Sequence, residues 1–284
     1  MEPTPGEPPG TSAASRSRAR CSRVRDWPEH AARRIFHCFY DAMSVSEDRT
    51  FLSGERTMNI VPPIRVKICC VQSEDEAATA VAFGAAAVGL VTGMPSGPPG
   101  LDVDSIRSIV AAVPPGTGTF LLTSATDVDR LTELAAHTGV NTLQLWDRLP
   151  REDYGRLRSR LPGVALVQAV HVVDDSAVDE AMEIAPRVDA IVLDSGNAAV
   201  PFRWEPATGR IHDWNISRRV VEALDRPVFL AGGITAVNVA AAVQTVRPYG
   251  IDVCTGVRTD DQLDVSKLSH LFESLARVSP VRAP

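Results

Sequence analysis

Two side chains suited to proton transfer follow short apolar segments of the sequence. Cys69 ends the run RVKIC, and Asp194 directly follows the apolar residues AIVL. A carboxyl group is a usual general acid, and a thiol becomes a base when positive charge or a helix N-terminus lowers its pKa. The stretch SEDE after Cys69 is one candidate helix start. Cysteine is also common in buried cores, so a packing role is the simpler interpretation of Cys69 taken alone.

A repeating pattern of elements must position these residues. From residue 65 onward, short β-branched runs alternate with longer segments of helical period, and eight such pairs follow one another. The strands are apolar throughout, which is typical of a parallel sheet covered by helices. Eight units close into an α/β fold of the (β/α)8 TIM-barrel type. A doubly wound open sheet is the alternative, but its usual glycine-rich first turn is missing from CCVQSEDE.

The barrel is predicted to occupy residues 61–284, after an N-terminal extension of residues 1–60. The first 26 residues are rich in Pro, Gly, Ser and Arg, a composition that buries too little apolar surface to become ordered. The segment WPEHAARRIFHCFYDAM has apolar residues at helical spacing and predicts a helix over 28–43. We expect that helix to dock on the barrel, or alternatively to bind a partner, and the rest of the extension to be poorly ordered.

Composition argues against several classes of protein. The net charge is −6 and Lys and Arg do not cluster after the first 35 residues, so no basic face for nucleic acid is expected. No apolar segment is long enough to cross a membrane. The five cysteines lack zinc spacing, and His171 and His212 stand apart from other ligands. We expect a cytoplasmic monomer or homodimer that binds a small molecule and needs no metal or other cofactor.

In such a barrel, active sites form where the carboxyl ends of the strands meet. Cys69 and Asp194 both end strands, so they would face one ligand from different sides. The segments AGGI and CTGV follow the last two strands, and their backbone N–H groups are suited to bind an anion. The alternative is that both are ordinary turns before helices. The predicted phosphate-binding residues are Gly232, Gly233, Thr255 and Gly256.

An ordered series of motifs, KICC, LQLW, IVLDSG, ATGRIHDW, PVFLAGGITAVNV and RPYGIDVCTGVR, resembles the phosphoribosylanthranilate isomerase family. The resemblance covers about residues 66–278. It implies an intramolecular oxidoreductase (aldose–ketose isomerase) of tryptophan biosynthesis, a branch of amino-acid biosynthesis. The family converts an N-(5-phosphoribosyl) amine to a 1-amino-1-deoxyribulose 5-phosphate by an Amadori rearrangement. By resemblance, Cys69 is the general base, Asp194 is the general acid, and the glycine-rich turns bind the substrate phosphate.

Several positions depart from the family pattern. Cys70 stands where the family has glycine, and MPSGPPG lacks the arginine that grips the anthranilate carboxylate in the family. Losing such a contact weakens binding by about one to two powers of ten. Trp146 replaces a histidine, and Gln168 replaces a frequent lysine. Arg203 or Arg210 is expected to substitute for the missing arginine. The expected substrate pocket contains Lys67, Gln144, Trp146, Gln168, His171, Arg203 and Arg210.

Three functions therefore stay open at the level of sequence. The first is an isomerase acting on phosphoribosylanthranilate or on a different amine, with Trp146 able to stack on an uncharged ring. The second is a divergent paralogue that binds a phosphosugar without converting it. The third is another reaction at the same rim, such as epimerisation or lyase chemistry, because this fold supports many chemistries.

Overall fold

The computed structural model describes residues 64–94, 100–195 and 211–278. These residues all fall within one compact unit, Met58–Pro284. The predicted helix at 28–43 and the two arginines of the predicted pocket, Arg203 and Arg210, lie outside the described residues.

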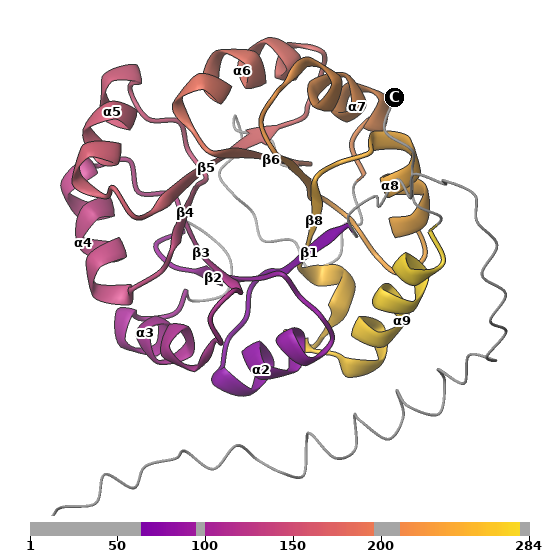
Figure 1. Cartoon of the computed structure of the whole chain (residues 1–284). Helices are drawn as coiled ribbons and strands as arrows, with labels where there is room; N and C mark the ends of the chain where they lie inside the picture. The colour runs from indigo at the N-terminus through magenta and orange to yellow at the C-terminus, as the bar shows by residue number, and fades with distance from the viewer. Residues whose placement is uncertain (1–63, 95–99, 196–210, 279–284) are drawn as a thin grey trace, which may run out of the picture. The chain divides into compact units, whose positions relative to one another are not determined.

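Eight parallel strands close into a barrel in simple sequence order (Figure 1). The strands are β1 (Arg65–Ile68), β2 (Ala87–Val91), β3 (Gly118–Thr123), β4 (Thr142–Leu145), β5 (Ala165–His171), β6 (Ala190–Asp194), β7 (Val228–Leu230) and β8 (Gly250–Val253). β8 pairs back onto β1, with Lys67 opposite Asp252, and this pairing closes the ring. The predicted TIM barrel is confirmed.

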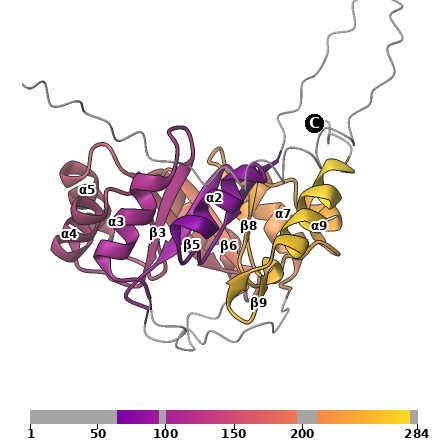
Figure 2. The ribbon, with the colours of Figure 1, turned by 90° about the horizontal axis from the view of Figure 1, so that it is seen from below.

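A helix follows each strand, and the helices form an outer ring around the barrel (Figures 1 and 2). They are α2 (Glu74–Ala82), α3 (Val103–Ala112), α4 (Val128–Thr138), α5 (Arg151–Arg160), α6 (Ser176–Ile184), α7 (Trp214–Ala223), α8 (Val239–Val246) and α9 (Val265–Ala276). Short 3-10 helices are η1 (Ala185–Arg187) and η2 (Thr255–Val257). A small hairpin of β9 (Arg258–Thr259) and β10 (Gln262–Leu263) was not predicted.

Polar caps fix where most of these helices begin. The side chains of Ser73, Asp102, Asp127, Asp213 and Asp264 each accept a hydrogen bond from a backbone N–H in the first turn of the helix that follows. Each such cap stabilises a helix by about 1 kcal/mol. These caps fix the residues at which the loops that follow the strands end and the helices begin.

Strand residues alternate between two separate cores, as a pleated strand requires. In β1, Val66 and Ile68 pack into the large core between the strands and the helices. Inside the barrel, a second cluster takes side chains from several different strands, including Phe120, Val192 and Phe229. We call the core between the strands and the helices the outer core, and the interior of the barrel the lumen. A strand residue whose two neighbours along the chain belong to the outer core therefore points into the lumen.

A buried ion pair joins the neighbouring strands β1 and β8 inside the lumen. Lys67 Nζ donates to Asp252 Oδ2 at 2.7 Å, and both side chains are almost completely buried. The ammonium also lies 5.4 Å from the ring centre of Phe120. Removing charges from water costs several kcal/mol per ion, so each of these two charges needs the other.

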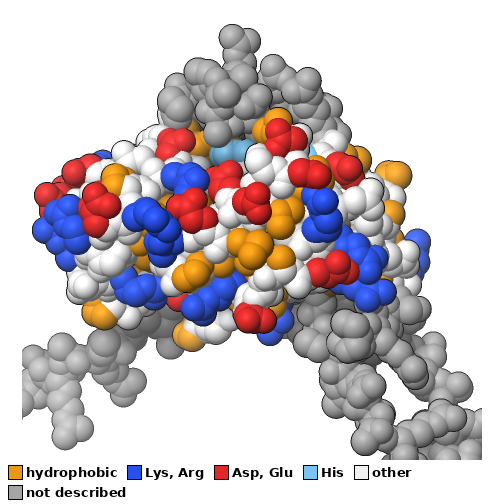
Figure 3. All heavy atoms as spheres, turned by 90° about the horizontal axis from the view of Figure 1, so that it is seen from above, with side chains coloured by type: hydrophobic (Ala, Val, Ile, Leu, Met, Phe, Trp, Pro, Cys, Tyr) orange, Lys and Arg blue, Asp and Glu red, His pale blue; other side chains and the backbone are white. Residues whose placement is uncertain are grey.

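The outside of the barrel carries charges of both signs. Figure 3 shows one side, where Lys and Arg side chains are interspersed with Asp and Glu. Many form exposed pairs, such as Arg148 with Glu183 at 3.0 Å, and such pairs contribute about 0 to 1 kcal/mol each. Stability therefore comes mainly from the two cores. Among the helices of the described ranges, none has the length and apolar character needed to cross a membrane.

The lumen has room for its polar side chains only because Gly89 in β2 has no side chain. A Cβ there would lie 2.7 Å from Cys69 Sγ and 2.9 Å from Lys67 Nζ. We expect Gly89→Ala to lower the free energy of unfolding by roughly 1 to 3 kcal/mol, because overpacking displaces these groups. Urea denaturation measures the change.

Gly155→Ala is the matched control for this prediction. Gly155 is exposed in α5 and nothing lies within 4 Å of an added Cβ. Alanine there is expected to stabilise by roughly 0.5 to 1 kcal/mol, because glycine is a poor helix former. Equal effects of the two substitutions would contradict the crowding at Gly89.

Candidate active site

Cys69 and Asp194 lie at the same rim of the barrel. Cys69 directly follows β1 and Asp194 is the last residue of β6. Cys69 is buried in a small lumen cluster with Leu122, Trp146 and Ala169, which come from or directly follow three other strands. The thiol is thus held inside the barrel mouth and does not belong to the core beneath the helices.

Lys67 lies two residues before Cys69, and its charge influences the thiol. Burial opposes the charge of Lys67, but the interactions with Asp252 and Cys69 together outweigh burial, so the pKa of Lys67 is raised. The pKa of Cys69 is well above its ordinary value, first because of the neighbouring Cys70 thiol and then because of burial. Lys67 acts in the opposite direction and favours the Cys69 thiolate. The thiol is a weak acid in the free protein, with one cation positioned to help it ionise.

Asp194 has the properties of a general acid. Burial raises the pKa of its carboxyl group, while His171 and the backbone N–H of Ser195 work against that rise. That N–H donates to Asp194 Oδ1 at 2.7 Å. A raised pKa keeps a proton available closer to neutral pH, which proton donation to a substrate requires.

Several buried polar atoms near the two residues have no hydrogen-bond partner within the described part of the chain. They are Oε1 of Gln144, both ring nitrogens of His171, and Oδ1 of Asp252. Gln144 lies between Leu143 and Leu145, which belong to the outer core, so its side chain faces the lumen. Unpaired buried polar groups are costly. These atoms are therefore suited to contact a polar ligand in the upper lumen.

Trp146 and His171 form one wall of this region. Their ring centres lie 4.5 Å apart with an interplanar angle of 59°. His171 pairs with Asp194 in the β5–β6 register, so this wall adjoins the candidate acid. The two rings offer a surface on which an aromatic group can pack.

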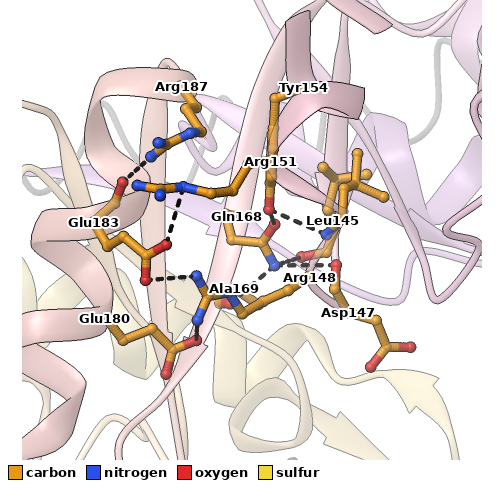
Figure 4. Close-up of polar contacts among 11 residues, drawn as sticks. Leu145, Asp147, Arg148, Arg151, Tyr154, Gln168, Ala169, Glu180, Glu183 and Arg187 are labelled. Carbon is orange, nitrogen blue, oxygen red and sulfur yellow. Dashed lines mark hydrogen bonds and ion pairs between the residues drawn. The ribbon is translucent and has the colours of Figure 1, made fainter. Parts of the chain in front are cut away.

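Gln168 does not belong to the pocket, and the prediction that it does is wrong. Its Oε1 accepts a hydrogen bond from Tyr154 in α5 at 2.7 Å, and its Nε2 donates to the carbonyl oxygens of Leu145 and Ala169, each at 3.1 Å (Figure 4). Residues three apart in a strand face opposite sides, so Gln168 and His171 were never able to share the lumen. Gln168 instead anchors α5 to the barrel.

The predicted phosphate turns lie in the loops after β7 and β8, which contact each other and the loop after β6. Gly232 and Gly233 have φ of 80° and 65°, a conformation that favours glycine. A Cβ on Gly232 would overlap Ser195 Oγ, and one on Gly256 would overlap the Ile234 carbonyl oxygen. The loops after β6, β7 and β8 therefore approach so closely that only glycine fits at these two contacts.

A histidine that the sequence analysis named only as an isolated residue supports these loops. His212 Nδ1 lies 2.8 Å from Ser195 Oγ, and its Nε2 lies 2.6 Å from Ser217 Oγ in α7. Burial lowers the pKa of His212 to about 4. The imidazole is thus neutral, with one nitrogen donating and the other accepting. The motif IHDW contained this residue, but its partner Ser195 is visible only in the fold.

The described residues offer no metal centre: within 64–94, 100–195 and 211–278, no three His, Cys, Asp or Glu side chains form a group that fits a metal ion.

Sequence comparison identifies relatives over the whole barrel. The family model "N-(5'phosphoribosyl)anthranilate (PRA) isomerase" matches residues 66–274. A protein of Haloferax volcanii named N-(5'-phosphoribosyl)anthranilate isomerase is 40% identical over 194 residues, covering 68% of this chain and 84% of that protein. A second, from Methanosarcina mazei, is 31% identical over 212 residues, covering 73% of this chain and 93% of that protein.

Solved structures show the same fold. The N-(5'-phosphoribosyl)anthranilate isomerase of Pyrococcus furiosus matches with a TM-score of 0.63 and 22% identity over 76% of this chain and all of that chain. The phosphoribosyl anthranilate isomerase of Thermotoga maritima matches with a TM-score of 0.66 and 23% identity over 75% of this chain and 98% of that chain. At these identities the likeness establishes the barrel fold alone.

The buried neutral His212 predicts a pH-dependent stability. Its pKa is about 4 in the folded protein and 6.5 ordinarily, so the unfolded chain takes up a proton first as the pH falls. Stability is therefore lost from about pH 6.5 down to about pH 4. We expect a loss of about 2 kcal/mol from this residue between pH 7.5 and pH 5, measured by urea denaturation.

The test compares variants, because carboxylates also titrate in this range. His212→Asn should show a pH dependence that is flatter by that amount, whereas His137→Asn, which removes an exposed histidine, should keep the slope of the parent. Parallel pH profiles for the parent and His212→Asn would show that the imidazole is not held neutral.

Proposed function

Because the chain belongs to the N-(5'-phosphoribosyl)anthranilate isomerase family, we propose that it converts N-(5'-phosphoribosyl)anthranilate to 1-(o-carboxyphenylamino)-1-deoxyribulose 5-phosphate. A relative of known structure holds the reduced form of that product. The chain is an isomerase of tryptophan biosynthesis, an intramolecular oxidoreductase. The observation that carries the proposed mechanism is that Cys69 and Asp194 end β1 and β6 at one rim, both within the field of Lys67 and Asp252.

The reaction needs one acid and one base. Asp194 donates its proton to the furanose ring oxygen while the lone pair of the amine nitrogen forms a C=N bond at C1, which opens the ring. The Cys69 thiolate then removes the proton from C2, the C–H electrons form a C1=C2 bond, and the π electrons of the C1=N bond return to nitrogen. The resulting enol-amine gains a proton at C1 and loses the proton of its C2 hydroxyl group, which gives the ketose. C1 is reduced as C2 is oxidised, so no external redox cofactor is needed.

Lys67 supports the base without exchanging protons itself. Its pKa is raised, so it remains charged through the reaction. A permanent cation beside a thiol favours the thiolate. Its partner Asp252 fixes the ammonium at 2.7 Å and keeps it from moving into the substrate site.

The glycine-rich turns are proposed to bind the substrate phosphate through backbone N–H groups. The residues are Gly232, Gly233, Thr255 and Gly256. Support comes from the positive φ of Gly232 and Gly233 and from the contacts that join these loops. Phosphate sites formed after the last two strands are frequent in this fold.

The amine is proposed to bind against Trp146 and His171. The loop after β2 lacks the arginine expected in the family, and His171 offers two buried ring nitrogens without partners in the described chain. An imidazole N–H donates well to a carboxylate. We propose that His171 contacts the anthranilate carboxylate while Trp146 packs on the ring and Gln144 binds a neighbouring polar group. Arg203 and Arg210 stay predictions as additional contacts.

The wider organisation is also a proposal. Residues 61–284 would form the catalytic barrel after an extension of residues 1–60. The enzyme would act in the cytoplasm on its phosphorylated sugar-amine, as a monomer or homodimer, without metal or another cofactor.

Replacing either reacting group should abolish most of the activity. We expect Cys69→Ser and Asp194→Asn to lower kcat/KM by roughly 10²- to 10⁴-fold, the usual contribution of a positioned acid or base. The assay follows the fluorescence of freshly generated substrate, with protein freed of host isomerase. Asp147→Asn, which changes an exposed carboxylate two residues after the end of β4, is the matched control and should retain parental activity.

Other outcomes separate the alternatives. Parental turnover by either variant would refute these roles. Phosphosugar binding by the parent without any turnover would instead identify a non-catalytic binding protein.

The contact with the carboxylate has its own test. We expect His171→Phe to raise KM for the anthranilate substrate by about 10- to 100-fold, because a charge-assisted hydrogen bond is lost. The phosphoribosyl derivative of aniline lacks the carboxylate, so the same substitution should change its KM only a few-fold. An equal rise for both compounds would place His171 at the sugar.

A further inference from the structure

Two further thiols, besides that of Cys69, lie close together where β1 and β8 close the barrel. Cys70 follows β1 and Cys254 precedes η2, and their Sγ atoms lie 2.6 Å apart. This separation is only about half an ångström longer than a disulfide bond. Both residues are free cysteines, although 184 positions separate them in the sequence.

The backbone holds the two thiols together without help from a bond between them. β1 and β8 pair along their length, and the Cys69 N–H continues the ladder by donating to the Val253 carbonyl oxygen at 2.8 Å. Cys70 has φ of 62°, the left-handed conformation that seldom suits a residue with a side chain. Its thiol is therefore set by a fixed and uncommon backbone geometry beside Cys254.

We propose that Cys70 and Cys254 are an oxidation site that forms a disulfide by exchange with a small-molecule disulfide. The Cys254 thiolate attacks one sulfur of the small disulfide, forms a mixed disulfide and releases one thiol. The Cys70 thiolate then attacks the Cys254 sulfur and releases the second thiol. The protein pair loses two electrons and two protons, and the small disulfide becomes two thiols.

The order of these two steps follows from exposure. Cys254 is partly exposed, whereas Cys70 is buried. Burial raises the pKa of both thiols, so exchange proceeds faster as the pH rises. In a reducing compartment the pair stays reduced.

The disulfide leaves Cys69 as a free thiol and joins β1 covalently to the loop after β8. A bond across so long a stretch of chain restricts the unfolded state strongly. Oxidation should therefore stabilise the barrel and tie the end of the strand that positions Cys69 to the turn that holds Thr255 and Gly256. The inference does not depend on the proposed reaction, because its readouts are chemical and thermal.

To test the proposal, the full chain with Cys21 and Cys38 replaced by serine is treated with oxidised glutathione. Three of the five cysteines then remain, so formation of the disulfide lowers the number of titratable thiols per chain from three to one. After alkylation and trypsin digestion, mass spectrometry should find the peptide of residues 68–107 linked to the peptide that contains Cys254. The melting temperature should rise by roughly 5 to 15 °C and return on reduction.

Variants identify the cysteine that forms the link, because residues 68–107 contain both Cys69 and Cys70. We expect the linked peptide to form in the Cys69→Ser variant and to be absent from the Cys70→Ser and Cys254→Ser variants. A link that survives Cys70→Ser and disappears in Cys69→Ser would overturn the proposal. Three thiols remaining after oxidation, or a glutathione adduct on Cys254 alone, would also overturn it.

Discussion

The buried ion pair between Lys67 and Asp252 is the interaction on which both fold and site depend. It exists only when β8 pairs with β1 in the observed register, which sets these two residues opposite each other. Breaking such a pair by removing one partner commonly costs about 3 to 5 kcal/mol, because a lone charge stays buried. Replacing both residues by apolar ones would often be tolerated. The stronger physical reason for the pair is its field, which reaches Cys69 on one side and Asp194 on the other.

The pKa shifts of Asp194 and Cys69 bear on the order in which the two groups would act. Burial raises the pKa of the Asp194 carboxyl group, and the Cys70 thiol together with burial raises the pKa of Cys69, so both shifts favour the neutral form, which suits an acid but not a base. In the proposed mechanism, protonation by Asp194 opens the ring and places a positive iminium group in the lumen near Cys69. A nearby cation lowers the pKa of a thiol, so the substrate itself, together with Lys67, helps to ionise the base. The thiolate is then needed only after the acid has acted, which is the order that the reaction requires.

The sequence predicted most of the fold and brought Cys69 and Asp194 to one rim as the proposed centre of the site, for physical reasons that also explain the failures. Apolar strands and capped helices are local patterns, and eight repeats of them left few arrangements open. Cys69 and Asp194 followed from their places at strand ends. The Lys67–Asp252 pair, the Ser195–His212 contact and the Cys70–Cys254 pair join residues that are distant in sequence, so they need strand register or loop packing. The assignment of Gln168 to the pocket was an avoidable error, because the alternation of side chains along a strand already puts Gln168 and His171 on opposite faces of the sheet.

The two halves of the rim are built differently, and this difference bears on how the site can change. Around β6, β7 and β8, close backbone contacts at Gly232 and Gly256 leave no room for any side chain. Substitution there would push the loops apart, so the half proposed to bind phosphate has little freedom. Around β4 and β5, the wall consists of side chains, among them Trp146 and His171. Two of the departures from the family pattern, Trp146 and the loop after β2, lie on the side proposed to bind the amine, as expected if amine recognition varies while phosphate binding is fixed by the fold.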